Sequence, residues 1–450
     1  MKSVARKPWR ALCASGVLGC AVMVATLAVG QMGGPVRALA PNYVLVAESP
    51  DPNSMPLYSP SIIRLESGRL VACYTLASKD LEENGPGQEV FLTSDDGGLT
   101  WTERARSSPL QGRLFEAAGV IYYLSTGAGM PAMRSADAGE TWSEPVLLTD
   151  PALVWQQTPA NVWHTNGRVY LAFERRSAVI NAWGPSVKAL VLLSARVTDD
   201  LTQAAAWTFS SELVFADVVP GVRENDPALD YFGVPFFPQN YPNRQVLTTN
   251  PTRSMSPMGW VEPMVVQVMD PNHYWYDPTG KTFHILARAH TGGTGYACVT
   301  KVVEDADGRM TMSLEHAPSG VPMLFVPMPG GQMRFHILYD AETRLYWLLS
   351  SQATDSMTRI ELLPPDRYDL PNNERHRLVL HFSKNLVDWC FAGLVDSTDS
   401  PRQARHYASM AIDGSDLVIL SRSGDARAES AHEGNIITFH RVKNFRELVY

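Results

Sequence analysis

Short runs of apolar residues, or of alternating apolar and polar residues, recur along most of the chain and are separated by tight turns. Residues 407–412 and 417–420 are two such runs, and Asp413-Gly414 separates them. Asp-Gly, Asn-Gly and Pro-x-Gly turns supply the positive φ values that tight hairpins require. Helical periodicity is scarce, so the pattern predicts an all-β protein. Six hairpins are predicted in this way, and the other five pair 61–63 with 70–74, 114–117 with 120–124, 162–164 with 169–173, 273–276 with 282–287, and 335–339 with 345–349.

The spacing of the turn glycines predicts how the hairpins assemble. Gly68, Gly119 and Gly167 recur about every 50 residues, close to the length of one four-stranded propeller blade. A six-bladed β-propeller fits this rhythm best. A longer interval follows Gly167 and leaves room for a seventh blade; it contains a strand-like run at 190–197 and a Pro/Asn-rich stretch at 235–251, which is interpreted as a long loop.

A second repeat falls between the hairpins. Residues 94–101 and 135–142 both have the pattern S-x-D-x-G-x-T-W, and weaker copies occur at 198–207 and 383–389. In such a turn we expect the Asp carboxylate to accept hydrogen bonds from backbone N–H groups of its own turn, and Gly to adopt a φ that a β-carbon disfavours. The Trp ring is expected to pack over the hairpin and cover the blade edge. These residues are therefore interpreted as structural.

The beginning of the chain differs from the rest. Basic residues at positions 2, 6, 7 and 10 precede an uncharged, mostly small or apolar segment at 11–30, and no acidic residue occurs before position 41. This pattern is typical of an export signal with Ala38-Leu39-Ala40 as a candidate cleavage site, and the segment is also long enough for an uncleaved membrane anchor. The residues around Cys20 match a lipoprotein signal more weakly. We therefore divide the chain into a leader, 1–40, and a propeller, 41–450. We expect the protein to be secreted or periplasmic, or anchored in a membrane with its propeller exported.

Charge and cysteine content narrow the function classes. The formal net charge is −8 at pH 7, and because the leader is basic the remainder is more acidic still. Such a protein is not expected to bind nucleic acid. Only Cys73, Cys298 and Cys390 follow the leader, too few for a disulfide scaffold, and neither CxxC nor HExxH occurs. We therefore expect no metal site and no other cofactor.

The two S-x-D-x-G-x-T-W repeats are Asp-boxes. On them the chain resembles the sialidase (neuraminidase) superfamily of six-bladed propellers, over residues from about 44 to 450. The resemblance implies three arginines that bind the carboxylate of a sugar, a Tyr–Glu pair acting as nucleophile and base, and an Asp acting as acid/base. A sialoside carries its carboxylate beside the reacting carbon, so a neutral tyrosine attacks where a carboxylate would be repelled. Arginine suits a carboxylate because its planar fork can donate two parallel hydrogen bonds.

The resemblance assigns these roles to particular residues. Tyr407, in Tyr-Ala-Ser-Met before the last hairpin, is the nucleophile candidate. Glu262, in Glu-Pro-Met-Val-Val, is the candidate base. The remaining candidates are the carboxylate-binding Arg288 and Arg375, with Arg377 as the alternative to Arg375, and the acid/base Asp80.

One part of the family pattern is not matched. The family opens its first blade with Arg-Ile-Pro, and here Tyr58 or Ser59 stands where that arginine is expected. Arg64 lies nearer the turn, at the far end of the predicted strand. A carboxylate held by two arginines is compatible with sialic acid, a uronic acid or another acidic sugar.

We therefore expect an exported exo-glycosidase that hydrolyses a terminal acidic sugar, sialic acid or another carboxylated sugar, from a glycan. One alternative is a polysaccharide lyase, in which His and Tyr abstract a proton next to a uronate carboxylate. His290 and His406 are the candidates for that role because they lie beside Arg288 and Tyr407 in the sequence. The other alternative is a glycan-binding propeller without turnover. Convergence of the candidate residues at one end of the propeller would favour an enzyme.

Overall fold

The structure, a computed structural model, describes residues 36–79, 87–108, 110–156, 160–179, 184–219, 259–291, 293–356, 358, 362, 374–400 and 402–450. The chain divides into two compact units, Met1–Arg37 and Ala38–Tyr450. Most of the predicted leader and the predicted loop at 235–251 lie outside the described residues. Within the described residues, no helix combines the length and the apolar character needed to span a membrane.

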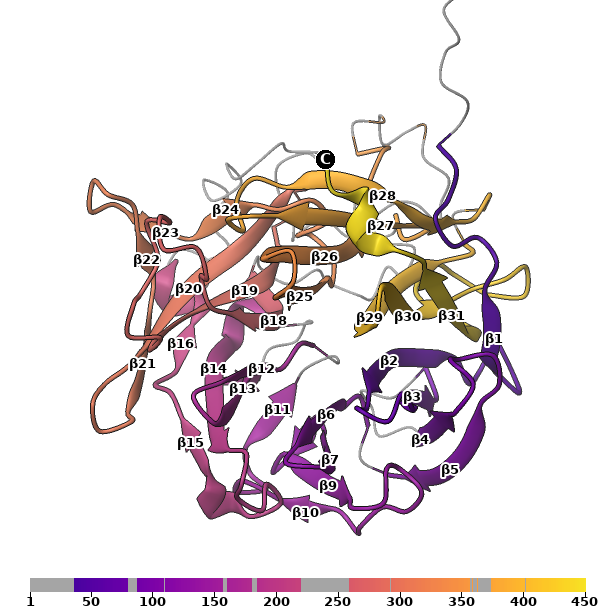
Figure 1. The fold of residues 1–450 in the computed structure, drawn as a ribbon, viewed down its shortest axis with the longest axis horizontal. Coiled ribbons are helices and arrows are strands. Elements are labelled where there is room, and N and C mark those ends of the chain that lie inside the picture. The colour runs from indigo at the N-terminus through magenta and orange to yellow at the C-terminus, as the bar shows by residue number, and fades with distance from the viewer. Residues whose placement is uncertain are drawn as a thin grey trace, which may run out of the picture. The chain divides into compact units, whose positions relative to one another are not determined.

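Within the unit Ala38–Tyr450, the described residues form six sheets of four or more strands, which follow one another around a common axis as the blades of a β-propeller (Figure 1). The all-β propeller predicted from the sequence is thereby confirmed. In chain order, the first two blades are formed by β2–β5 (Leu57–Arg64, Leu70–Ala77, Gly87–Ser94, Thr102–Ser107) and by β6, β7, β9 and β10 (Arg113–Ala117, Val120–Leu124, Pro131–Ser135, Val146–Leu147). The third and fourth are formed by β8 and β11–β16 (Gly127–Ala128, Val154–Gln156, Trp163–Thr165, Arg168–Arg176, Lys188–Arg196, Trp207–Phe209, Leu213–Val214) and by β18–β21 and β24 (Gly259–Val266, Thr282–His290, Tyr296–Glu304, Met310–Ser313, Phe325–Pro327). The fifth and sixth are formed by β25–β28 (His336–Asp340, Leu345–Ser351, Arg377–Ser383, Cys390–Ser397) and by β29–β31 with β1 (Arg405–Asp413, Asp416–Ser423, Ile436–Val442, Val44–Glu48). The remaining described elements are the hairpin β22–β23 (Glu315–His316, Pro322–Met323), the helix α1 (Phe215–Val218) and the 3₁₀ turns η2 (Pro185–Val187), η3 (Ala204–Ala206) and η9 (Phe445–Leu448).

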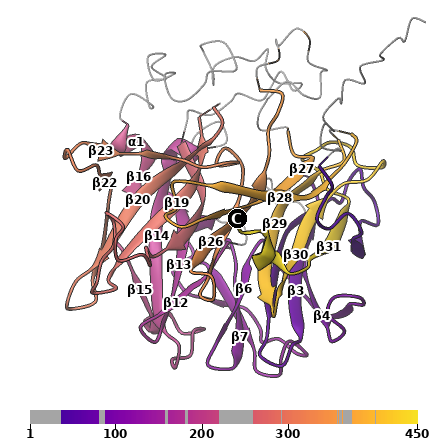
Figure 2. The ribbon, with the colours of Figure 1, turned by 45° about the horizontal axis from the view of Figure 1, so that its top comes forward.

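Strand pairing joins the two ends of the propeller. β1 pairs antiparallel with β31, so an N-terminal strand completes the blade that the last three strands begin (Figure 2). Just before β1, the backbone N–H groups of Leu39 and Ala40 donate to the carbonyls of Leu394 and Val395 on β28. The last two residues of the candidate cleavage motif therefore pack with the propeller, while removal of the leader stays a prediction.

Five of the six predicted hairpins are confirmed, and one is wrong. Residues 273–276 were expected to pair with the strand now seen as β19, but they form turns, and β19 pairs with β18 instead. The aromatic run there is held as a loop by short-range bonds: the backbone N–H of Trp275 donates to Nδ1 of His273 at 2.9 Å. β18 has all eight residues buried, so it provides the larger apolar surface for pairing with β19. The run at 190–197 is confirmed as a strand, β14.

The two S-x-D-x-G-x-T-W turns, at 94–101 and 135–142, have hydrogen bonds from backbone N–H groups to the Asp carboxylate. In the first turn, the backbone N–H groups of Leu99 and Thr100 donate to Oδ1 of Asp96 at 3.0 and 2.9 Å. The Trp101 ring packs on Phe439 of the adjacent blade, with ring centroids 5.7 Å apart. Gly98 has φ +92°, and a β-carbon there would lie 2.3 Å from the Phe439 ring, so only glycine fits. The tryptophan thus joins two blades in addition to covering its own hairpin.

The buried carboxyl group of Glu89 on β4 makes the stability of the propeller dependent on pH. Its Oε2 accepts hydrogen bonds from the Thr75 hydroxyl at 2.6 Å and from the backbone N–H of Gln111 at 3.1 Å. Burial, as the largest cause, raises the pKa of Glu89 to about 7. The folded state therefore binds more protons than the unfolded state between the two pKa values, and stability falls as the pH rises through that window.

Glu89→Gln removes this titration while keeping an acceptor of the same shape. Between about pH 5 and about pH 8, we expect the free energy of unfolding of the wild type to fall by about 2–3 kcal/mol more than that of the variant. Urea unfolding at both pH values measures the difference. Equal losses in the two proteins would contradict the assignment to Glu89.

Candidate functional site

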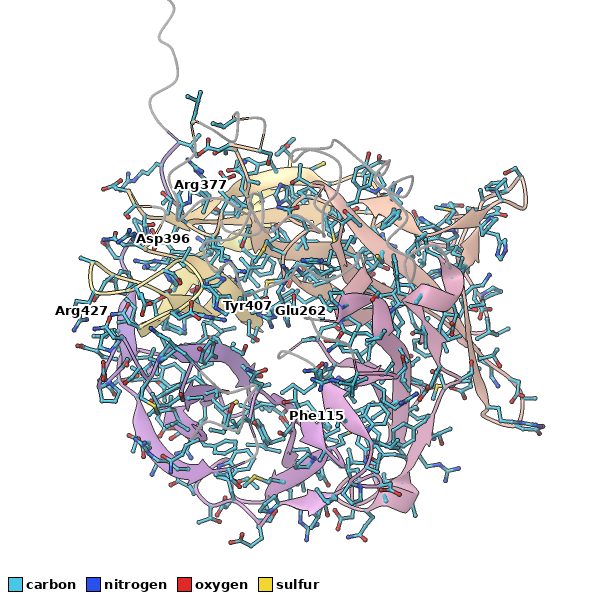
Figure 3. The ribbon with its side chains drawn as sticks, turned by 180° about the vertical axis from the view of Figure 1, so that it is seen from behind. Phe115, Glu262, Arg377, Asp396, Tyr407 and Arg427 are labelled. Atoms are coloured by element: carbon cyan, nitrogen blue, oxygen red, sulfur yellow. The ribbon has the colours of Figure 1, made fainter. Side chains whose placement is uncertain are left out.

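Tyr407 and Glu262 form a hydrogen-bonded pair near the starts of two inner strands, β29 and β18. The Tyr407 hydroxyl donates to Oε1 of Glu262 at 2.6 Å. Both residues are buried, with 7% and 6% of their surface exposed. They lie next to each other although they come from different blades (Figure 3). This is the geometry that a base needs in order to take a phenolic proton.

A β-bulge directs each of these two side chains. The pairing register shifts around Glu262 in β18 and around Tyr407 in β29. Their φ values are 58° and 48°, in the left-handed region that residues with a β-carbon rarely adopt. Such a bulge re-aims one side chain, and the surrounding structure must hold the strain. Ser59 in β2 has the same feature, with φ 37° inside a register shift.

Arg288 on β19 contacts both members of the pair. Its Nη1 donates to the Tyr407 hydroxyl at 2.9 Å and lies 3.5 Å from Oε2 of Glu262. Its Nε donates to the backbone carbonyl of Gln332 at 2.8 Å, which fixes the direction of the guanidinium. The structure therefore brings three of the sequence candidates into direct contact.

Arg375 covers the ring of Tyr407 from another side. Its guanidinium carbon lies 5.5 Å from the centroid of that ring, and the residue is 5% exposed. Nη1 of Arg375 lies 3.2 Å from Nδ1 of His406. Because arginine only donates, Nδ1 is the acceptor, and the proton of a neutral His406 is on Nε2.

Arg422 is a third arginine at this site, and the sequence interpretation missed it. It lies on β30, opposite His406 in the strand register. Its guanidinium carbon is 4.4 Å from the ring centroid of Tyr58 and 5.4 Å from that of Tyr407, and the residue is 2% exposed. It also donates from Nη2 to the backbone carbonyl of His432. In the sequence, the only signal was an arginine near the end of the apolar strand that begins at Asp416.

The site has more positive than negative groups around the phenol. Burial is the largest cause that raises the pKa of Tyr407, and the charge of Glu262 adds to it. Arg288 and Arg375 oppose that shift. Burial lowers the pKa of Arg375 to about 10, so Arg375 remains charged at neutral pH, and burial also lowers the pKa of Arg422 below its usual value. Buried cations that outnumber their carboxylate partners suit an anionic ligand.

Glu174 on β13 is a second carboxyl group that the sequence interpretation missed. Its Oε1 accepts the backbone N–H of Glu262 at 3.3 Å, and its Oε2 lies 4.0 Å from Nζ of Lys188. It is 3% exposed. Burial first, and the charge of Glu262 in addition, raise the pKa of Glu174 to about 7. Glu174 therefore supports the bulge at Glu262 and changes charge near neutral pH.

Glu174→Gln should remove a pH dependence from substrate binding. Above about pH 7 the ionised carboxylate adds a negative charge next to Glu262, so we expect the KM for an anionic sugar to rise roughly three- to tenfold between about pH 6 and about pH 8. The neutral glutamine can still accept the N–H of Glu262 and should leave KM flat. Steady-state kinetics across this range tests the effect, and a KM rise of equal size in the variant would contradict it.

Two other candidates from the sequence, Asp80 and Arg377, are not among the residues seen in contact with Tyr407. Asp80 lies outside the described residues. Its neighbour Lys79 forms an ion pair with Glu429, in the loop that also contains His432. Arg377 is directed elsewhere: its Nη1 donates to the Thr354 hydroxyl at 2.8 Å and lies 3.2 Å from Oε1 of Glu374. It lies away from Tyr407 and Glu262 in Figure 3.

The two candidate histidines are buried beside the arginines. His290 is 2% exposed, and burial, with the charge of Arg288, lowers its pKa to about 3. Burial, with the charges of Arg375 and Arg422, holds the pKa of His406 well below its usual value. Both rings are therefore neutral at neutral pH. Among the described residues, no group of three or more His, Cys, Asp or Glu side chains is arranged to hold a metal ion.

Comparison with known proteins shows the fold. No family model and no curated protein matches the chain. Among solved structures, a protein of unknown function from Dyadobacter fermentans gives a TM-score of 0.52 at 12% identity, over 91% of this chain and 99% of that one. Trypanosoma rangeli sialidase in complex with sialic acid gives 0.50 at 14% identity, over 91% of this chain and 60% of the sialidase. A Penicillium chrysogenum α-L-arabinanase complexed with arabinobiose gives 0.48 at 12% identity, over 91% and 99%. This chain therefore has a propeller fold of the kind that sialidases use.

Proposed function

We propose that this protein is a retaining exo-glycosidase that removes a terminal carboxylated sugar, with sialic acid as the leading candidate, from a glycan. The observation that carries the proposal is the hydrogen bond of 2.6 Å between Tyr407 and Glu262. A buried tyrosine that donates to a carboxylate and is flanked by arginines is a nucleophile suited to an anionic sugar, because it reaches the reacting carbon without a charge of its own.

Binding is assigned to Arg288, Arg375 and Arg422. Their guanidinium groups lie on several sides of the Tyr407 hydroxyl and ring. Charge-assisted hydrogen bonds from these groups would hold the sugar carboxylate and place the anomeric carbon at the phenol oxygen. Arg422 thus supplies the third cation that is missing at Tyr58 and Ser59.

The reaction proceeds in two displacements. In the first, Glu262 takes the phenolic proton while the Tyr407 oxygen bonds to the anomeric carbon. The bond to the leaving oxygen breaks, and Asp80 donates a proton to that oxygen. In the second, Asp80 takes a proton from water, whose oxygen bonds to the same carbon. The Tyr407 oxygen leaves and recovers its proton from Glu262. Two inversions retain the anomeric configuration.

The lyase alternative requires a histidine that can accept a proton from carbon. Nδ1 of His406 already accepts a hydrogen bond from Arg375, and its Nε2 carries the proton. His290 has a pKa of about 3 and is a weak base. Both observations favour hydrolysis over elimination.

Assays with matched substrates test the proposal. Purified full-length protein is incubated with fluorogenic glycosides of sialic acid, glucuronic acid and neutral arabinofuranose, and proton NMR follows the anomeric configuration of the released sugar. Release of a carboxylated sugar with retention is the expected result. With a uronate oligosaccharide, whose C4–O bond to the next sugar can break by elimination, an unsaturated product absorbing in the near ultraviolet would indicate a lyase instead, and no turnover of any of these acidic substrates would favour a binding propeller.

A further inference from the structure

Two buried basic side chains two positions apart in the sequence, Arg334 and His336, have polar atoms that none of the described residues pairs. Nη1 of Arg334 donates to the backbone carbonyl of Ala408 at 2.5 Å, but its Nε and Nη2 have no partner among the described residues. Nδ1 of His336, the first residue of β25, also lacks a described partner. Arg334 is 2% exposed and His336 5%. Buried polar groups are normally paired, so these atoms are able to bind a ligand.

A third basic side chain, Arg113 on β6, contributes charge to the same interior. It is fully buried and donates to the backbone carbonyls of Asn161 and Ala172 at 2.7 and 3.0 Å. Burial, with the charge of Arg334, lowers the pKa of Arg113, and burial with the charges of Arg334 and Arg113 lowers that of His336. These three residues therefore lie within electrostatic reach of one another, and the interior between them is positive.

A cavity borders His336, the first residue of β25. It has a volume of about 670 Å³ and is lined by residues late in the inner strands, among them 61–64 of β2 and 409–412 of β29. Tyr407, by contrast, is the third of nine residues in β29, and Glu262 is the fourth of eight in β18. His336 and Asn161 are part of the cavity lining, while the unpaired Nδ1 of His336 is itself buried behind that lining.

We propose that a small inorganic anion, chloride in an ordinary salt solution, binds inside the propeller on Arg334 and His336. An anion accepts hydrogen bonds from the unpaired Nε and Nη2 groups, and arginine offers only donors there. It also offsets the charges of Arg334 and Arg113 beyond the part that Glu262 and Tyr407 offset at Arg334. The proposal does not rest on the glycosidase activity, because it is argued from the unpaired atoms of Arg334 and His336, although the charges of Glu262 and Tyr407 also act on Arg334.

Halide titration of the full-length protein tests the site. Thermal unfolding is followed while sodium gluconate is replaced by sodium chloride or bromide at constant ionic strength. A ligand that binds only the folded state raises the Tm with its concentration, so we expect a rise of about 2–4 °C with either halide and none with gluconate. Arg334→Gln should remove the rise. Arg309→Gln, whose side chain is 77% exposed on a surface turn, should keep it.

Anomalous diffraction from crystals soaked in bromide gives the position independently of any variant. A bromide peak in contact with the guanidinium of Arg334 is the expected result, and it decides the question even if Arg334→Gln fails to fold. No Tm difference between halide and gluconate, or bromide peaks only at other places, would overturn the proposal. Neither outcome would bear on the hydrolysis of glycosides.

Discussion

Tyr407→Phe is expected to abolish glycoside hydrolysis while leaving the propeller folded. The variant loses the oxygen that would bond to the anomeric carbon, so the two-step route is closed. Loss of an activated nucleophile should lower kcat by at least about 10³-fold. The ring itself remains between Arg375 and Arg422, so the packing around it is preserved. Steady-state kinetics with the best acidic glycoside measures the loss.

Tyr122→Phe is the matched control for this experiment. Tyr122 on β7 is also buried, 3% exposed, and it belongs to an apolar cluster between blades away from the Tyr407 site. The kcat of Tyr122→Phe should equal that of the wild type, and both Tyr122→Phe and Tyr407→Phe should unfold cooperatively. Activity of Tyr407→Phe within tenfold of the wild type would rule out the tyrosyl intermediate.

The fold could be predicted because its signals are local. A hairpin turn such as Asp413-Gly414 and an Asp-box turn such as that of Asp96 are completed by residues a few positions apart, and the observed bonds span three or four positions. Blade spacing then follows from counting turns. The error at 273–276 has the same origin, because an aromatic run satisfies the strand pattern whether or not a partner strand is available.

The site could be predicted only where a family motif covered it. Tyr407 and Glu262 were identified by resemblance, but the bulges that direct them were not, because no propensity places tyrosine or glutamate at positive φ. Arg422 and Glu174 had no motif. Arg422 and Glu174 each lie on a second or third strand of a blade. Their side chains come together with Tyr407 and Glu262 only when the blades have assembled around the axis. Contacts between blades of this kind depend on tertiary structure that local patterns do not contain.

Arg422→Gln should selectively weaken the hydrolysis of carboxylated sugars. We proposed that Arg422 supplies the third cation in place of the arginine that is absent at Tyr58 and Ser59, and its guanidinium stacks on the ring of Tyr58. A charge-assisted hydrogen bond contributes about 1.5–3 kcal/mol, so kcat/KM should fall by roughly 10- to 100-fold for the acidic glycoside. For the matching carboxamide, which carries no charge, the fall should be less than about threefold. Arg422→Lys should recover part of the loss, because it keeps the charge without the planar fork.

The comparison of the two substrates separates recognition from packing. Arg422 also donates to the backbone carbonyl of His432 and packs on Tyr407, so its loss will lower the Tm whatever its role. A purely structural arginine would reduce the turnover of the acid and of the amide by the same factor. Arg309→Gln, an exposed arginine in the turn between β20 and β21, controls for loss of net charge and should change neither. If Arg422→Gln lowered kcat/KM by the same factor for both substrates, binding of the sugar carboxylate would have to be assigned to Arg288 and Arg375 alone.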